Sequence, residues 1–321
     1  MKSGCSHPSK LWAVTSYFNP ARYRSRLRNY QAFRRHLDLP LLTLYHDPTG
    51  NHELSESDAE ILIRVGDGDV MWQKERLFNL ALEHLPGECE KIVWLDCDVL
   101  FVKDGWAKRV ETALDEVPVV QPFQVARHIS PEETHRAWST GNFPQIESEA
   151  STEFSVVDLW RNKTPISPSR HLVPRPPGPH AICGLGWATR RELSEQLPFF
   201  DAFVIGSGDA AFFSGITGDR HIYTRPWGPP ALVEAFEKWA ARAWNIVGSR
   251  VRSVEATICS LWHGSFTDRN YVNRWSVLTE HCFDPDRDLM LSPGGAWSWK
   301  TEKPAFHQAV KNYFYSRSED N

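Results

Sequence analysis

The sequence predicts one α/β domain built on a mostly parallel sheet that is flanked by helices. Short apolar runs alternate with segments of helical spacing in the first part of the chain, which is typical of strand–helix–strand crossovers. The 321 residues, of which 41% are hydrophobic, suffice for a large buried core. No internal repeat or change in composition marks a second unit, so we expect a single domain over residues 1–321.

Four apolar runs define the first strands of this sheet. The last of them is the most apolar and is therefore expected at the centre of the sheet. Helices are expected where apolar residues recur at intervals of three and four. In chain order, the strands are predicted over residues 11–17, 41–45, 61–65 and 91–95, and the helices over residues 22–37 and 72–85.

The second half of the chain has a less regular pattern. A proline-rich stretch over residues 165–179 predicts a surface loop. The polar and aromatic residues 276–321 are expected to wrap the domain. Further strands are predicted over residues 117–123, 181–187 and 257–262, and further helices over residues 192–197, 210–214 and 231–247.

Composition and charge narrow the functional classes. The formal net charge is -4 and the basic residues form no long run, which argues against nucleic acid as a partner. No apolar stretch approaches the ~20 residues of a transmembrane helix, and the polar first ten residues show no secretory signal. Six scattered cysteines without a C-x-x-C pair indicate reduced thiols. We therefore expect a soluble cytoplasmic protein without a transmembrane segment.

Two carboxylates, Asp96 and Asp98, directly follow the most apolar strand. Open α/β sheets bind ligands beyond the carboxyl ends of their strands, and residues two apart share a face of extended backbone. Carboxylate oxygens are the ligands that Mg2+ and Mn2+ prefer, and such an ion can neutralise a departing diphosphate. The alternative is an acidic turn that caps the next element. A second pair, Asp67 and Asp69, surrounds a glycine and is more typical of a solvated turn.

Several short segments, in this order, resemble the β-galactosyltransferase and polypeptide N-acetylgalactosaminyltransferase group of the GT-A glycosyltransferases. Residues 74–82 resemble the family's nucleotide-contacting helix, and the Asp-x-Asp pair follows. A glycine-rich turn before a helix, 182–192, then precedes Phe-Phe-Asp at 199–201. A second glycine-rich turn, 205–213, carries an acid, and 261–264 resembles the segment that supplies a third metal ligand. The resemblance implies a GT-A fold of the Rossmann-like type.

The resemblance covers about residues 11–265 and also implies that two halves of the domain have different functions. Residues 11–125 would form the nucleotide-sugar donor half and residues 126–275 the acceptor and catalytic half. Two departures are visible. The second turn contains one acid, Asp209, with Ala210 beside it where the family has paired acids. The chain also lacks the membrane anchor of the luminal members, so it is more similar to a bacterial, soluble relative.

The resemblance assigns the catalytic and metal-binding roles. Asp209 is implied as the general base, and its alternative role is to cap the helix that follows it. Asp96, Asp98 and His263 are implied as ligands of Mn2+ or Mg2+, with a packed core histidine as the alternative for His263. The Asp-x-Asp pair alone is a weak signal, and the preceding strand makes it more specific.

Further residues are implied to contact the donor or the acceptor. Thr15, Ser16 and Tyr17 end the first strand, where GT-A enzymes hold the nucleoside base. Arg76 and Asn79 lie three apart and can face one ligand. Gly184 and Gly186 would allow close approach to the donor sugar, and Trp187 would stack on the acceptor. The alternatives are strand termination, a solvated Arg76, ordinary turn glycines and core packing of Trp187. A diphosphate clamp would use Arg269, Tyr271 and Arg274.

These features together predict a metal-dependent glycosyltransferase that moves a hexose from a nucleotide diphosphate sugar, most simply a UDP-sugar, to a hydroxyl of a carbohydrate or another acceptor. Asp209 as a base implies inversion at the sugar carbon. One alternative is a phosphatase of the haloacid-dehalogenase type, which also places Asp-x-Asp after an apolar strand. Leu100 and Phe213 stand where that pattern has other residues. The other alternative is a non-catalytic sugar-binding protein with a GT-A-like fold.

Overall fold

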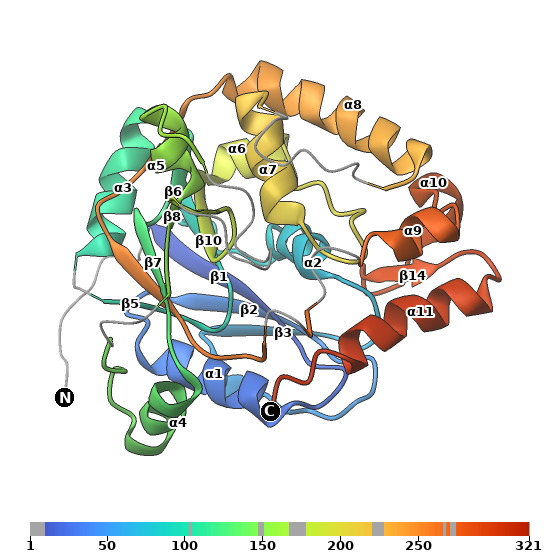
Figure 1. The fold of residues 1–321 in the computed structure, drawn as a ribbon, viewed down its shortest axis with the longest axis horizontal. Coiled ribbons are helices and arrows are strands. Elements are labelled where there is room, and N and C mark those ends of the chain that lie inside the picture. The colour runs from blue at the N-terminus through green and yellow to red at the C-terminus, as the bar shows by residue number, and fades with distance from the viewer. Residues whose placement is uncertain are drawn as a thin grey trace.

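The computed structural model describes residues 10–102, 105–146, 151–166, 178–219, 228–265, 268–269 and 274–320. These residues form a mixed α/β fold in which a large, mostly parallel sheet has helices on both faces (Figure 1). The predicted fold class is therefore confirmed.

The central sheet has the strand order β11-β6-β10-β4-β1-β2-β3. The four strands from β3 to β4 run parallel, β10 is antiparallel to both of its neighbours, and β11 is parallel to β6. β4 occupies the middle, as its apolar sequence predicted, since a strand paired on both sides buries both of its faces. The strands are β1 (Leu11–Phe18), β2 (Leu41–His46), β3 (Ile61–Val65), β4 (Lys91–Leu95), β6 (Val119–Gln121), β10 (Gly186–Arg190) and β11 (Val251–Ser253).

Alternate side chains of the central strands face two separate cores. Ala13 and Val93 belong to a cluster that includes side chains of α1 and α3. Val14 and Trp94 belong to a cluster that includes side chains of α2, α6 and α7. These helices are α1 (Arg24–Arg35), α2 (Lys74–Ala81), α3 (Trp106–Glu116), α6 (Arg191–Gln196) and α7 (Gly208–Thr217). The carboxyl ends of β1 and β4 therefore emerge between two helical layers.

A second sheet begins immediately after the Asp-x-Asp pair. Its order is β5-β12-β7-β8-β9, and its strands are β5 (Val99–Phe101), β7 (Val125–His128), β8 (Ser151–Ser155), β9 (Ala181–Ile182) and β12 (Thr257–Ser260). The single strand predicted over 181–187 is wrong, because β9 and β10 lie in different sheets. Leu185, between them, has a φ of 77°, so the backbone leaves the extended conformation between β9 and β10.

Several helix boundaries differ from the prediction. Trp72 N donates to Val204 O at 2.8 Å, so residue 72 belongs to a loop and α2 is shorter than predicted. α8 (Pro230–Val247) agrees with its prediction, whereas α3, α4 (Pro131–Thr140) and α5 (Val156–Arg161) were not predicted. Most of the predicted loop over 165–179 lies outside the described residues. No helix in the described ranges combines the length and apolarity that a membrane span requires.

The C-terminal residues pack beside α8 at one end of the molecule (Figure 1). The second acidic pair fastens the hairpin of β13 and β14 to the body: Asp67 accepts from Gly294 N at 2.7 Å, and Asp69 accepts from Trp299 N at 2.8 Å. This pair is therefore structural. The C-terminal elements are α9 (Ser276–Glu280), α10 (Pro285–Asp288), β13 (Leu289–Leu291), β14 (Trp297–Trp299) and α11 (Pro304–Tyr315).

Candidate functional site

Asp96 and Asp98 stand at the carboxyl end of β4, between the two sheets. Asp96 is tied to the turn before β10, because Asp96 N donates to Leu185 O at 3.1 Å and Asp96 Oδ2 accepts from Leu185 N at 3.2 Å. The end of β4 and the turn that contains Gly184 are thus fixed against each other. A carboxylate and a glycine turn that the sequence separates by almost ninety residues meet in one place.

Lys74, the first residue of α2, links Asp96 to Asp209. Its Nζ lies 2.8 Å from Asp96 Oδ1 and 2.7 Å from Asp209 Oδ2. Burial lowers the pKa of Lys74, but the two carboxylates raise it well above its ordinary value, so the ammonium stays charged. The sequence analysis did not predict that Lys74 belongs to the site. The only available signal was a basic residue at the start of the helix that resembles the nucleotide-contacting one.

Asp98 meets the predicted third ligand, His263. Asp98 Oδ2 lies 3.3 Å from His263 Nδ1, and Nδ1 also lies 2.6 Å from Leu261 O. Burial and the neighbouring Asp96 raise the pKa of Asp98 to about 7. Burial and Arg269 lower the pKa of His263, so the ring is neutral at pH 7. With Nδ1 donating to the Leu261 carbonyl, Nε2 carries the lone pair that a metal ion could accept.

These residues suit a divalent ion that takes most of its ligands from a substrate. Asp98 meets the Nδ1 side of the His263 ring rather than Nε2, and Asp96 Oδ1 is directed at Lys74. In the described part of the chain, no group of three or more His, Cys, Asp or Glu side chains is arranged to hold an ion. Mg2+ sites commonly use one or two protein carboxylates together with substrate phosphates and water. The chemistry of the donor set fits such an ion, and the assignment of Asp96, Asp98 and His263 as ligands stays a prediction.

Asp209 lies in the first turn of α7 and does not cap this helix. Ser207 occupies the cap position with a φ of 91°, and no side chain makes the capping bond. The alternative role of Asp209 as the cap is therefore wrong. A Cβ placed on Gly184 would lie 3.6 Å from Asp209 Oδ2, so the carboxylate faces the first glycine turn. Burial raises the pKa of Asp209, and Lys74 opposes that shift. The Asp209 carboxylate thus lies next to a glycine that has no side chain, and its role as a base stays a prediction.

Glu75 is a second acidic residue near Asp209 that the sequence did not reveal. It is 3% exposed, and its Oε2 accepts from Trp72 Nε1 at 2.8 Å. Among the described residues its Oε1 has no hydrogen-bond partner. Burial raises the pKa of Glu75 to about 7. A Cβ at residue 208 would lie 2.1 Å from the Glu75 carboxyl carbon, so Gly208 leaves the space that this carboxyl group fills.

Substituting Gly208 with Ala is expected to destabilise the protein by about 1–3 kcal/mol, because the added methyl group collides with the buried Glu75 carboxyl. Urea denaturation of the variant measures this loss. The matched control is Gly87→Ala, where an added Cβ meets no atom within 4 Å. Equal stability of the two variants would contradict the tight fit between Gly208 and Glu75.

The predicted base-binding residues lie at the end of β1, beside the end of β4. Thr15 is fully buried and donates to Leu95 O at 2.8 Å. Tyr17 is fully buried and donates to Glu53 Oε2 at 2.9 Å, while Ser16 is half-buried. These contacts give Thr15 and Tyr17 structural roles, and the contact of all three with a nucleoside base stays a prediction.

Arg76 and Asn79 both bind the segment that leads into α7. Arg76 Nη1 lies 3.2 Å from Asp201 Oδ2, and Asn79 Nδ2 donates to the same oxygen at 3.0 Å. Asn79 also donates to Phe199 O at 2.9 Å and accepts from Phe199 N at 2.8 Å. α2 is therefore fastened to the chain around residue 200. Donor contact by Arg76 or Asn79 stays a prediction.

Gly186 and Trp187 open β10 against β4. A Cβ on Gly186 would lie 2.8 Å from Leu95 Cδ2, so this glycine is needed for the close pairing of the two strands. Trp187 is 1% exposed and packs edge-on against Phe212 of α7 at 5.1 Å between ring centres. This burial favours core packing for Trp187, and its contact with an acceptor stays a prediction, as does the approach of Gly184 and Gly186 to the donor sugar.

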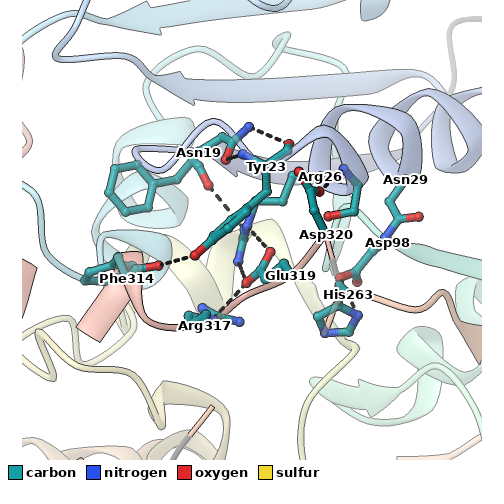
Figure 2. Close-up of polar contacts among 12 residues, drawn as sticks. Asn19, Tyr23, Arg26, Asn29, Asp98, His263, Phe314, Arg317, Glu319 and Asp320 are labelled. Atoms are coloured by element: carbon teal, nitrogen blue, oxygen red, sulfur yellow. Dashed lines mark hydrogen bonds and ion pairs between the residues drawn. The ribbon is translucent and has the colours of Figure 1, made fainter. Parts of the chain in front are cut away.

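The C-terminal residues reach the Asp98–His263 pair, which the sequence did not predict. Figure 2 shows this segment between α1 and His263. Arg26 Nη2 donates to Glu319 Oε1 at 2.8 Å, and Asp320 accepts from two backbone N–H groups at the start of α1, at 2.8 and 2.9 Å. A Cβ on Gly264 would lie 3.0 Å from the Glu319 Cα. One wall beside the candidate metal ligands is therefore built from the end of the chain.

The arginines of the predicted diphosphate clamp also lie in this region. Arg269 Nη2 donates to His263 O at 3.0 Å, and Arg274 Nη2 donates to Ser207 Oγ at 2.6 Å. Tyr271 lies outside the described residues. Arg269 therefore supports the backbone of the predicted metal ligand, while Arg274 binds the residue at the N-cap position of α7.

No protein-family model and no curated protein matches the chain. Among solved structures, S. aureus TarS 1-349 in complex with UDP-GlcNAc is similar with a TM-score of 0.41 and 11% identity, over 96% of this chain and 72% of that one. The mannosyltransferase PcManGT from Pyrobaculum calidifontis, in complex with GDP-Man and Mn2+, has a TM-score of 0.41 and 15% identity, over 95% and 69%. A 4-diphosphocytidyl-2C-methyl-D-erythritol synthase from Anaerococcus prevotii DSM 20548 has a TM-score of 0.35 and 9% identity, over 77% and 86%.

Proposed function

We propose that this protein is a GT-A-type glycosyltransferase of the bacterial, soluble kind, which moves a hexose from a nucleotide diphosphate sugar, a UDP-sugar in the simplest case, to a hydroxyl acceptor with inversion. One observation carries the proposal. Asp96 and Asp209 lie at the glycine turn before β10 and share the ammonium of Lys74, while Asp98, two residues after Asp96, lies beside His263, which follows β12. Apart from Lys74, these residues are the metal ligands and the base that the motif resemblance implies.

Two sets of residues have separate roles in this reaction: one set would hold the metal ion, and Asp209 acts as the base. Asp98 and His263, with Asp96, would hold Mn2+ or Mg2+, which supplies the positive charge that a departing diphosphate needs. On the acceptor side of the sugar, Asp209 takes the proton of the acceptor hydroxyl while the oxygen of that hydroxyl forms a bond to the sugar C1. The bond from C1 to the diphosphate oxygen breaks, and its electron pair leaves with the nucleoside diphosphate. Attack and departure on opposite faces of the sugar carbon produce inversion.

A donor-library thermal-shift screen, with and without Mn2+, tests this function. Ligands that bind only the folded state raise the melting temperature, by an amount that follows from ligand concentration and Kd. We expect a rise with one nucleotide diphosphate sugar in the presence of Mn2+, and little or no rise with the same donor in EDTA or with the nucleoside monophosphate. A library in which no donor shifts the melting temperature would contradict the proposal. Turnover of a simple phosphomonoester would favour the phosphatase alternative instead.

A further inference from the structure

The ammonium group of Lys74 lies between two carboxylates that the proposed function places on opposite sides of the reaction. Asp96 belongs to the metal and donor side, and Asp209 is the base on the acceptor side. Lys74 Nζ is within 2.8 Å of one oxygen of each. Charge-assisted hydrogen bonds of this length are directional, so each bond fixes the orientation of its carboxylate.

Lys74 is itself held in place. Its side chain is 12% exposed, and its Nζ lies 5.8 Å from the ring centre of Phe78. The residue before it, Gln73, exchanges two hydrogen bonds with the backbone of Trp297, at 2.8 and 2.9 Å. Both the helix start and the side chain of Lys74 are held in place. Forming the two ion pairs therefore costs Lys74 little conformational entropy, in contrast to a surface lysine.

The carboxylates of Asp96 and Asp209 both lie against the turn before β10. Asp96 Oδ2 accepts from Leu185 N, in the turn that contains Gly184. Asp209 is bound by Lys74 through Oδ2, the oxygen that faces the Cβ position of Gly184. Hydrogen bonds and ion pairs therefore connect Asp209 through Lys74 and Asp96 to the turn before β10. Within the described ranges, Lys74 supplies the ion pair with Asp209.

We propose that Lys74 is a positioning residue of the transfer reaction, which holds the Asp209 carboxylate beside the first glycine turn and fixes its place relative to Asp96. This role rests on the proposed function. Asp209 is ionised before it accepts the acceptor proton, and the ammonium stabilises that ionised form through the 2.7 Å bond. Lys74 itself exchanges no proton and contacts no reacting atom. A base displaced by about 1 Å can cost about 100-fold in rate, which is the scale of effect expected when the support is lost.

A double-mutant cycle on transfer rates tests this role. Lys74→Met, which keeps the length of the side chain and removes its charge, is expected to lower kcat about 10- to 100-fold. In an Asp209→Asn background the same substitution is expected to change kcat by less than about 3-fold, because Lys74 acts through Asp209. Lys74→Arg, which keeps the charge, is expected to retain more activity than Lys74→Met. If Lys74→Met does not fold, Lys74→Gln takes its place in the cycle.

The matched control is Lys108→Met, since Lys108 is a 76% exposed lysine paired with Glu111 on the surface, and its kcat is expected to equal that of the unsubstituted chain. A Lys74→Met variant with unchanged kcat, or one whose loss multiplies fully with that of Asp209→Asn, would overturn the positioning role. An unsubstituted chain that transfers no sugar from any donor would overturn the proposed function, and the role of Lys74 with it. The two failures are therefore distinguishable.

Discussion

Asp209→Asn is expected to lower the rate of sugar transfer by about 100-fold or more while the affinity for the donor stays the same, because the amide cannot accept the acceptor proton. The substitution keeps the shape of the side chain, and Asp209 contributes no hydrogen bond to the capping of α7. The fold should therefore tolerate it. The rate is measured as released nucleoside diphosphate in the presence of an acceptor, and donor affinity by calorimetry.

A matched carboxylate distinguishes this effect from a general loss of charge. Asp115 is 67% exposed and pairs with Lys91 on the surface, so Asp115→Asn is expected to transfer sugar at the normal rate. Normal transfer by Asp209→Asn would refute the assignment of Asp209 as the base. Loss of donor affinity together with rate would place Asp209 on the donor side instead.

The parallel strands of the central sheet were predictable from the sequence, and most of the second sheet was not. β1, β2 and β4 are mostly apolar runs, because strands buried on both faces carry apolar side chains at most positions. In the second sheet β12 was predicted, over residues 257–262, whereas β5, β7 and β9 contain two to four residues each, too few for a period to show. Residues 181–187 are divided between two sheets, and Leu185 between them has a positive φ. No pattern in the sequence predicts a positive φ at a leucine.

The acidic residues of the candidate site were predictable, and their supports were not. Asp96 and Asp98 follow directly from a strand end, where ligands of open α/β sheets bind. Lys74 and Glu75 are charged residues in the first turn of a helix, a pattern that usually indicates solvent exposure. Their burial depends on how α2 meets β4 and α7, which is a property of the tertiary structure. The same holds for Glu319, which becomes buried only because the end of the chain returns to α1.

Asp96→Ala and Asp98→Ala are each expected to abolish metal-dependent binding of the donor and leave the fold intact. Asp98 Oδ2 lies 3.3 Å from His263 Nδ1, and the substitution would remove one of the two carboxylates proposed to hold the ion. Loss of Asp96 would leave Lys74 paired with Asp209 alone. The second acidic pair provides the control: Asp69→Ala removes the bond to Trp299 N in the C-terminal hairpin and is expected to preserve the metal dependence of donor binding. Circular dichroism checks the fold of each variant.

Calorimetric titration of a UDP-sugar into the unsubstituted chain and into Asp98→Ala, each in Mn2+ and in EDTA, tests the metal site most directly. The unsubstituted chain is expected to bind the donor in Mn2+ and to lose most of that affinity in EDTA, because Asp96, Asp98 and His263 would hold the ion and the ion would supply the positive charge that the diphosphate needs. Asp98→Ala is expected to show the weak binding of the EDTA sample under both conditions. Donor binding by Asp98→Ala with the full Mn2+ dependence of the unsubstituted chain would contradict the account.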